Sequence, residues 1–185
     1  LKKDGRSFTA AIGDIMVEAM KRDPKIVAAT AAMPDGTGVS KLLKLFPDRA
    51  WDTGICESHA LDMMAGLAKT GFKPFFAVYA TFLQRAFDQA FQESALQGLP
   101  VRLLLDRAGL VGGDGAVHHG FCDISILRVL PNAAITAAID EPSMKADLEP
   151  AVSASRIMTP ALDEASVFSI EVSRATIEPS PVSCW

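Results

Sequence analysis

The apolar positions of this chain alternate between two patterns: a helical spacing and a short continuous run. In residues 7–22, apolar side chains recur every three or four positions, which is the spacing of an amphipathic helix. Residues 25–32, "KIVAATAA", instead form a short, continuous apolar run, typical of a strand buried on both faces. The alternation continues along the chain. We expect further helices at 38–46, 57–69, 81–98, 124–130 and 141–155, and further strands at 49–54, 73–80, 101–108, 133–139 and 166–173.

Buried strands that alternate with helices predict an α/β fold: a three-layer αβα sandwich around a mainly parallel sheet. The length of 185 residues suits one domain. We expect residues 1–175 to form this domain and residues 176–185, which are rich in Pro and Ser, to be a flexible tail. Because the first residue is Leu1 and not Met, we also expect the chain to be part of a longer polypeptide.

Composition and charge narrow the range of partners. Hydrophobic residues make up 49% of the chain and charged residues 22%, as in a well-packed globular domain. The net charge of −4 offers no basic field, so nucleic acid and anionic membranes are poor candidates. The apolar runs are far shorter than the roughly 18–20 residues of a membrane span. Three widely separated cysteines without Cys-x-x-Cys spacing predict neither a disulfide framework nor a metal site, and favour a cytoplasmic location.

Ligands of parallel α/β sheets bind beyond the carboxyl ends of the strands, so the junctions after each strand are the candidate site. At one junction, Glu57 begins a helix directly after the segment "GIC". A carboxylate in the first turn of a helix is stabilised by the helix dipole without any further role. A carboxylate that enters an apolar pocket can also be functional. The position of Glu57 leaves both interpretations open.

The junction at 109–120 contains five glycines together with Asp114, His118 and His119. Such a backbone suits close approach to a ligand or a flexible turn. Two histidines in a cleft can act as acid, base or hydrogen-bond donors. A metal site is the competing interpretation, but neighbouring histidines seldom ligate one ion together.

Two arginines lie near strand ends. Arg85 and Arg107 can clamp a phosphate or a carboxylate there. The simpler alternative is an ordinary ion pair, of Arg85 with Asp88 and of Arg107 with Asp106. For either arginine alone, the residues favour the ion pair.

Several long strings of this sequence belong together. In order, "AATAAMPDGTG", "FPDRAWDTGICESHA", "ATFLQRAFDQ" and "LPVRLLLDRAGLVGGDGAVHHG" resemble the pyrimidine-binding domain of 1-deoxy-D-xylulose-5-phosphate synthases. The resemblance runs from about Phe8 to Glu149. It implies the thiamine-diphosphate-binding fold. It also implies a part in condensing pyruvate with glyceraldehyde 3-phosphate, with decarboxylation, to 1-deoxy-D-xylulose 5-phosphate, an isoprenoid precursor.

The same resemblance implies roles for individual residues at the cofactor. Glu57 would hydrogen-bond the ring nitrogen of the aminopyrimidine and act in catalysis. Phe82 would stack on this ring, Met33 would line its pocket, and Arg85 would lie beside the cofactor. Mg²⁺ would be held by a diphosphate-binding domain outside this chain.

At the substrate, the resemblance implies contacts from Tyr79, Arg107, Asp114 and His118, and His118 would also help to move protons. It further implies a homodimer and an isolated chain without turnover, because the other domains are missing. The chain departs from the family at "CESH", where "AEQH" is usual, and at "EVS" near the last strand. These changes leave two alternatives open: a non-catalytic dimerisation or regulatory paralogue, and another transketolase-like thiamine enzyme.

Overall fold

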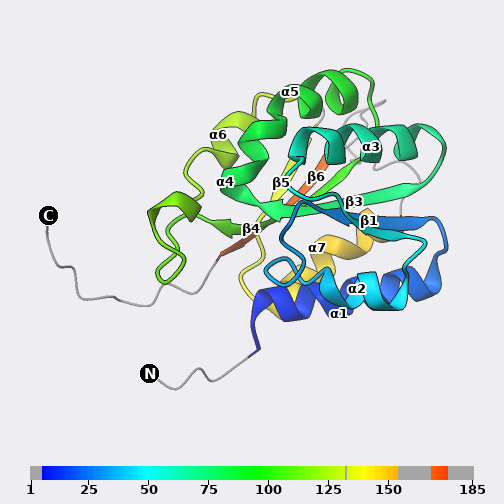
Figure 1. The fold of residues 1–185 in the computed structure, drawn as a ribbon, viewed down its shortest axis with the longest axis horizontal. Coiled ribbons are helices and arrows are strands. Elements are labelled where there is room, and N and C mark those ends of the chain that lie inside the picture. Colours follow the sequence, from blue (N-terminus) through cyan, green and yellow to red (C-terminus); the bar gives the residue numbers. More distant parts are fainter. Residues whose placement is uncertain (1–5, 132, 154–167, 175–185) are drawn as a thin grey trace, which may run out of the picture.

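A six-stranded parallel sheet forms the middle layer of the molecule (Figure 1). The computed structural model describes residues 6–131, 133–153 and 168–174. Across the sheet the strands follow the order β2-β1-β3-β4-β6-β5, and all neighbours run parallel. Their bounds are β1 Ile26–Thr30, β2 Ala50–Asp52, β3 Lys73–Tyr79, β4 Arg102–Ala108, β5 Ala133–Thr136 and β6 Phe168–Arg174. Every residue of β1 and β3 is buried, as expected for strands covered on both faces.

Helices cover both faces of this sheet, which confirms the predicted αβα sandwich (Figure 1). One layer consists of α3 (Glu57–Lys69), α4 (Ala80–Leu83), α5 (Phe87–Gln89) and α6 (Asp123–Leu127). The opposite layer consists of α1 (Phe8–Arg22), α2 (Ser40–Leu45) and α7 (Glu141–Ser153). Each layer encloses its own apolar core against the sheet. The sequence places α1 well, because the Ser7 side chain accepts a hydrogen bond from the backbone N–H of Ala10 and caps the helix.

The single long helix predicted for 81–98 is wrong. The chain instead forms α4, a 3₁₀-helix (Gln84–Ala86), α5 and a π-helix (Ala90–Ala95). Ala86 leaves helical geometry with φ −116° and ψ 17°. The Ser58 hydroxyl donates a hydrogen bond to the carbonyl of Arg85 at 2.6 Å. A side chain that takes a backbone carbonyl in this way interrupts the helical ladder and explains the break.

The other predicted elements are present with smaller shifts of their ends. The strand predicted for 133–139 ends at Thr136, and the helix predicted for 124–130 spans Asp123–Leu127. The predicted tail, 176–185, lies outside the described residues. Within the described part of the chain, no helix is long and apolar enough to cross a membrane.

Candidate active site at the carboxyl edge of the sheet

The carboxyl ends of four neighbouring strands bring the candidate residues to one edge of the sheet, here called the carboxyl edge. Thr30 of β1 is in register with Asp52 of β2, and Tyr79 of β3 with Asp106 of β4. The loops after β1, β2, β3 and β4 therefore begin side by side. Segments far apart in the sequence meet here, as the rule for parallel sheets predicts.

Glu57 is the buried carboxylate of this edge. It is the first residue of α3, and only 3% of its surface is exposed, although Ile55 just before it is 75% exposed. Its Oε1 accepts a hydrogen bond from Nη1 of Arg85 at 2.5 Å. The alternative partner considered for Arg85 was Asp88, and that pairing is wrong. Glu57 is therefore a buried, ion-paired group and not an ordinary exposed residue of a first helical turn.

Three rings pack together next to this carboxylate, and we call Tyr79, Phe82 and His118 the ring cluster. Tyr79 and Phe82 stack with centroids 5.9 Å apart and planes 10° from parallel. His118 meets both rings edge-on, at 5.9 Å from Tyr79 and 5.6 Å from Phe82. The guanidinium carbon of Arg85 lies 4.7 Å above the Phe82 ring. Arg85 thus contacts both a flat aromatic surface and a buried carboxylate.

Arg107 reaches the other side of the ring cluster from an unusual backbone position. Its φ of 58° is left-handed, and the register of β4 with β6 shifts between Leu105 and Ala108. Such a bulge re-aims a side chain at the end of a strand. The Arg107 guanidinium carbon lies 4.4 Å above the Tyr79 ring. This explains why the predicted strand delivers its arginine toward the site.

The guanidinium of Arg107 is held by three oxygens. Nη1 donates to Asp106 at 2.6 Å and to the carbonyl of Gly36 at 2.8 Å, and Nε donates to Asp114 at 2.7 Å. Burial lowers the pKa of Arg107, but the hydrogen bonds to Asp114 and Asp106 outweigh it, so the pKa is raised and the charge permanent. The Asp106 pairing considered from the sequence is confirmed, and Asp114 is a second partner.

Tyr79 packs against Gly36 in the loop after β1. A Cβ on Gly36 would overlap the Tyr79 hydroxyl oxygen, so a larger residue there would displace the tyrosine ring. Burial raises the pKa of the Tyr79 hydroxyl, and the nearby charge of Arg107 only partly opposes this. The tyrosine is therefore a neutral hydrogen-bond donor over the whole physiological range.

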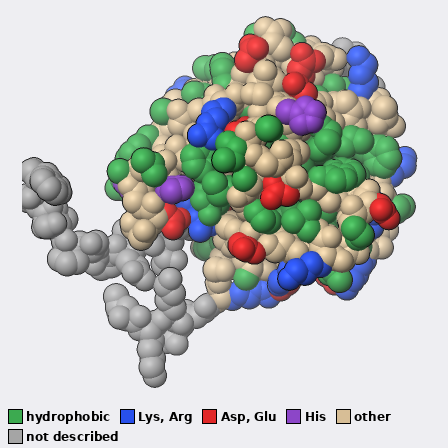
Figure 2. Space-filling view, in the orientation of Figure 1, with side chains coloured by type: hydrophobic (Ala, Val, Ile, Leu, Met, Phe, Trp, Pro, Cys, Tyr) green, Lys and Arg blue, Asp and Glu red, His purple; other side chains and the backbone are tan. Residues whose placement is uncertain are grey.

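Asp114 and His118 come together through the glycine-rich loop. The hydrogen bond from Arg107 holds the pKa of Asp114 below its usual value, so this carboxylate is ionised at neutral pH. The carbonyl of Asp114 lies 2.7 Å from Nδ1 of His118. Because a carbonyl can only accept, Nδ1 carries the proton and Nε2 of the neutral ring is an acceptor. The same loop exposes the apolar side chains of Leu110 and Val117. Figure 2 shows hydrophobic side chains gathered across the middle of this face of the molecule, among scattered charged ones.

The neighbouring His119 has a different role. Its Nδ1 accepts a hydrogen bond from the backbone N–H of Val111 at 3.1 Å, and its ring packs edge-on against Phe121. It therefore secures the loop and lies apart from the ring cluster. No group of three or more His, Cys, Asp or Glu able to hold a metal ion occurs among residues 6–131, 133–153 and 168–174.

Met33 is the predicted residue with the weakest link to this site. It is half-buried in the loop after β1, and its carbonyl accepts hydrogen bonds from the backbone N–H and the hydroxyl of Thr37. No described contact joins its side chain to the ring cluster. Its role at a cofactor stays a prediction.

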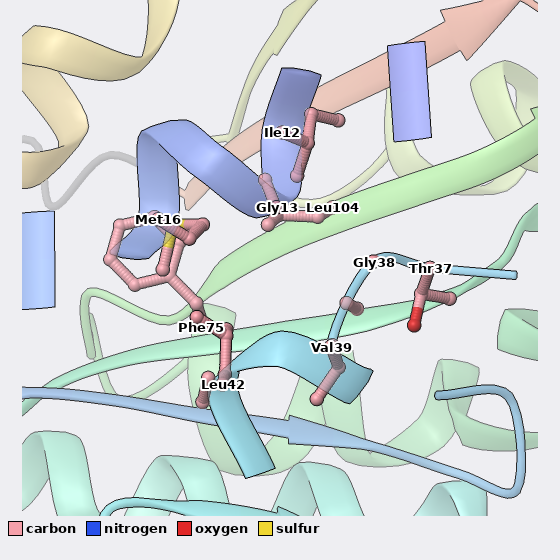
Figure 3. A pocket seen from close by; sticks show the side chains of 11 residues that line it. Ile12, Gly13, Met16, Thr37, Gly38, Val39, Leu42, Phe75 and Leu104 are labelled. Carbon is pink, nitrogen blue, oxygen red and sulfur yellow. The ribbon is translucent and has the colours of Figure 1, made fainter. Parts of the chain in front are cut away.

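A small apolar cavity lies away from this edge. It has a volume of about 10 Å³, room for about one water molecule, between α1, the segment at α2 and the sheet (Figure 3). Ile12, Met16 and Phe75 line it, and none of the predicted site residues does. It marks loose packing in the α1 layer and is too small for a cofactor.

Two contributions to the site were missed by sequence reasoning. Ser58, which bonds to Arg85, had been noted only as a departure from the family pattern. Thr9 of α1 donates a hydrogen bond from its hydroxyl to Asp106 at 2.8 Å across 97 positions of sequence. Neither contact leaves a signal in local spacing, because each joins segments that meet only through the fold.

Comparison with known proteins identifies the family to which this αβα sandwich belongs. Residues 4–161 match the family model described as "Transketolase, pyrimidine binding domain". The chain belongs to this family.

Its relatives include 1-deoxy-D-xylulose-5-phosphate synthases. The enzyme of Clostridium perfringens strain SM101 is 54% identical over 138 residues, which are 74% of this chain and 22% of that protein. The Geobacter sulfurreducens synthase 1 is 49% identical over 152 residues, 82% of this chain and 24% of that protein. The resemblance predicted from the motifs is confirmed. The chain spans about a quarter of the length of these relatives.

Solved structures agree on the fold. A split-gene transketolase, described as an inactive β4 tetramer, superimposes with a TM-score of 0.75 at 27% identity over 94% of this chain and 53% of that chain. The transketolase of Campylobacter jejuni gives a TM-score of 0.74 at 20% identity over 90% of this chain and 25% of that chain. The predicted thiamine-diphosphate-binding fold is therefore confirmed.

Proposed function

We propose that this chain forms the pyrimidine-binding half of a thiamine-diphosphate site in a 1-deoxy-D-xylulose-5-phosphate synthase. The complete enzyme would condense pyruvate with glyceraldehyde 3-phosphate and release carbon dioxide. The observation that carries the proposal is the buried carboxylate of Glu57, which Arg85 links to the face of the Phe82 ring. The synthases at about 50% identity support the choice of reaction.

The residues present fit an aminopyrimidine. A flat heteroaromatic ring needs an apolar face to stack on and a partner for its ring nitrogen, and Phe82 and Glu57 supply these. When bound, thiamine diphosphate supplies the electron sink for the decarboxylation of pyruvate. Glu57 would hydrogen-bond the ring nitrogen and share a proton with it, and the burial of its carboxyl group would keep water away from that contact.

The substrates would meet the side of the ring cluster that carries Arg107. Arg107 has a permanent charge, and its Nη2 makes no hydrogen bond to another described residue, so it can attract a carboxylate or phosphate group. Tyr79 can donate from its hydroxyl, and Asp114 orients Arg107. Nε2 of His118 can accept and return a proton, because Nδ1 is engaged by Asp114.

Other parts of the site would come from outside this chain. We propose that a diphosphate-binding domain holds Mg²⁺, that the complete protein is a cytoplasmic homodimer, and that the isolated chain has no turnover. The share of 22–24% of the relatives' length supports this division. The inactive tetramer formed by the split-gene transketolase chain supports the loss of turnover.

The test is product formation by the full-length protein that carries this chain. With pyruvate, glyceraldehyde 3-phosphate, thiamine diphosphate and Mg²⁺, we expect 1-deoxy-D-xylulose 5-phosphate. Glu57→Gln keeps the shape of the side chain and should lower turnover by about 100-fold or more, because it removes the shared proton. Substantial turnover by this variant would contradict the role of Glu57. A folded, dimeric protein without any product would favour the non-catalytic paralogue.

A further inference from the structure

Arg85 contacts both groups that the proposed function assigns to the aminopyrimidine ring, the Glu57 carboxylate and the Phe82 ring. Its Nη1 donates to Glu57 at 2.5 Å, and its guanidinium carbon lies 4.7 Å above the ring of Phe82. A guanidinium is planar and carries its donors at its edge, as an aminopyrimidine does. The side chain thus satisfies the buried carboxylate and covers the aromatic face at the same time.

Arg85 differs from Glu57 in its freedom to move. The Arg85 side chain is 53% exposed, whereas that of Glu57 is 4% exposed. An exposed guanidinium can turn into water with little change in its solvation, but a buried carboxylate left without a donor is costly. An aminopyrimidine whose ring nitrogen carries the shared proton is also a planar donor, so its exchange for Arg85 would keep Glu57 paired before and after the ring enters.

Ser58 holds the backbone that carries this arginine. Its hydroxyl donates to the carbonyl of Arg85 at 2.6 Å, immediately before the break at Ala86. Ser58 also follows Glu57 directly in α3. One short hydrogen bond therefore ties the first turn of α3 to the 3₁₀-helix (Gln84–Ala86) and sets where the Arg85 side chain begins relative to Glu57.

We propose that Ser58 is a positioning residue that holds Arg85 in the pyrimidine subsite, and that Arg85 must leave this subsite before the cofactor ring can enter. This inference rests on the proposed function. It differs from the role expected from the family resemblance, in which Arg85 lies beside the bound cofactor. The two roles predict opposite effects of removing the guanidinium.

The experiment uses the full-length protein with Mg²⁺ and follows the binding of thiamine diphosphate by stopped-flow fluorescence and calorimetry. Arg85→Met removes the guanidinium and keeps the length of the side chain. We expect about fivefold faster association and tighter binding, since a half-exposed ion pair no longer has to open. Arg85→Lys, which keeps a charge without the flat face, should lie between Arg85→Met and the unchanged protein. It also serves as the second variant if Arg85→Met fails to fold.

The role of Ser58 has its own pair of variants. Ser58→Ala should raise the association rate in the same direction as Arg85→Met, and Ser58→Thr, which keeps a hydroxyl, should restore the original rate. Gln84→Met is the matched control, because Gln84 is an exposed neighbour in the same 3₁₀-helix. Without cofactor, Ser58→Ala should also speed amide hydrogen exchange in residues 84–89.

Each outcome decides between the roles. Slower or weaker binding by Arg85→Met would show a direct contact with the cofactor and overturn the proposal, and unchanged binding would overturn it too. If Ser58→Ala changes neither cofactor binding nor amide hydrogen exchange, Ser58 is not a positioning residue. If the folded protein binds no thiamine diphosphate while Ser58→Ala still speeds exchange, the proposed function fails and the tie between Ser58 and Arg85 stands.

Discussion

Charged residues lie at both edges of the sheet, but their partners differ. At the amino edge, where the strands begin, Lys73 starts β3 and Arg102 starts β4. Both donate to backbone carbonyls of α7, Lys73 to Val152 at 2.9 Å and Nε of Arg102 to Ala151 at 2.9 Å. Lys73 also pairs with Asp23 at 2.8 Å. At the carboxyl edge, the pairs described for Arg85 and Arg107 are mainly with carboxylate side chains.

This difference in partners separates charged residues that stabilise the fold from those that can bind a ligand. The carbonyls of Ala151 and Val152 belong to the last described turn of α7, and the two cations supply hydrogen-bond donors to them from the sheet. Backbone partners of this kind cannot move without unfolding the helix end. Carboxylate side chains can exchange one donor for another. The charges at the amino edge therefore hold the fold, and those at the carboxyl edge remain available to a ligand.

The largest expected effect is on Arg102, whose surface is 1% exposed. Burial lowers the pKa of its guanidinium to about 10, yet it stays charged at neutral pH. Arg102→Met would leave the carbonyls of Ala151 and Pro100 without this donor. We expect the free energy of unfolding to fall by about 3 kcal/mol, measured by urea denaturation of the 185-residue chain.

A matched control is an arginine that contacts the same helix, α7, at the protein surface. Arg22 of α1 pairs with Glu149 of α7 through both terminal nitrogens, but both side chains are more than half exposed. Arg22→Met should leave the free energy of unfolding unchanged within error. An equal loss of unfolding free energy in Arg102→Met and Arg22→Met would show that burial of the charge makes no difference to its contribution.

The second effect concerns Lys73 and its acid partner. Nζ of Lys73 lies 2.8 Å from Asp23, and this hydrogen bond holds the pKa of Asp23 below its ordinary value of 3.8. A lowered carboxyl pKa gives stability that is complete above the ordinary value and is lost as the pH falls through the lowered one. Lys73→Met should cost about 2 kcal/mol at pH 7. The difference from the unchanged chain should shrink below pH 3.8 in a series of urea titrations. A difference independent of pH would show that Asp23 is not the relevant partner.

The fold could be predicted from sequence because local signals agree along most of the chain. The apolar runs of β1 and β3, the Ser7 cap and the helical stripe of α3 each identify their element without long-range information. Prediction failed at 81–98, where the apolar stripe suits one helix. The break depends on Ser58, which reaches the carbonyl of Arg85 from 27 residues away. A contact of that kind has no local signature.

The residues of the site could be predicted from the sequence, but the ion pairs between them could not. The rule for strand ends and the family resemblance placed Glu57, Tyr79, Phe82 and His118 at one edge, and the structure brings them together. The pairing of Glu57 with Arg85 was not predicted, because Asp88 is nearer to Arg85 in the sequence. The left-handed backbone of Arg107 could not be predicted either, because the sequence of β4 has the pattern of a regular strand.

The smallest effect concerns Ala32, at the carboxyl edge. Ala32 has a left-handed φ of 59°, and its backbone N–H donates to Asp52 at 2.7 Å. Ala32→Gly should relieve this strain, but glycine also gains freedom in the unfolded chain. We expect a net gain of only about 0.5 kcal/mol in the free energy of unfolding, visible as a higher melting temperature. Ala29→Gly, in the regular part of β1, should lower it instead. A loss of stability in Ala32→Gly would mean that the left-handed backbone at Ala32 carries no such strain.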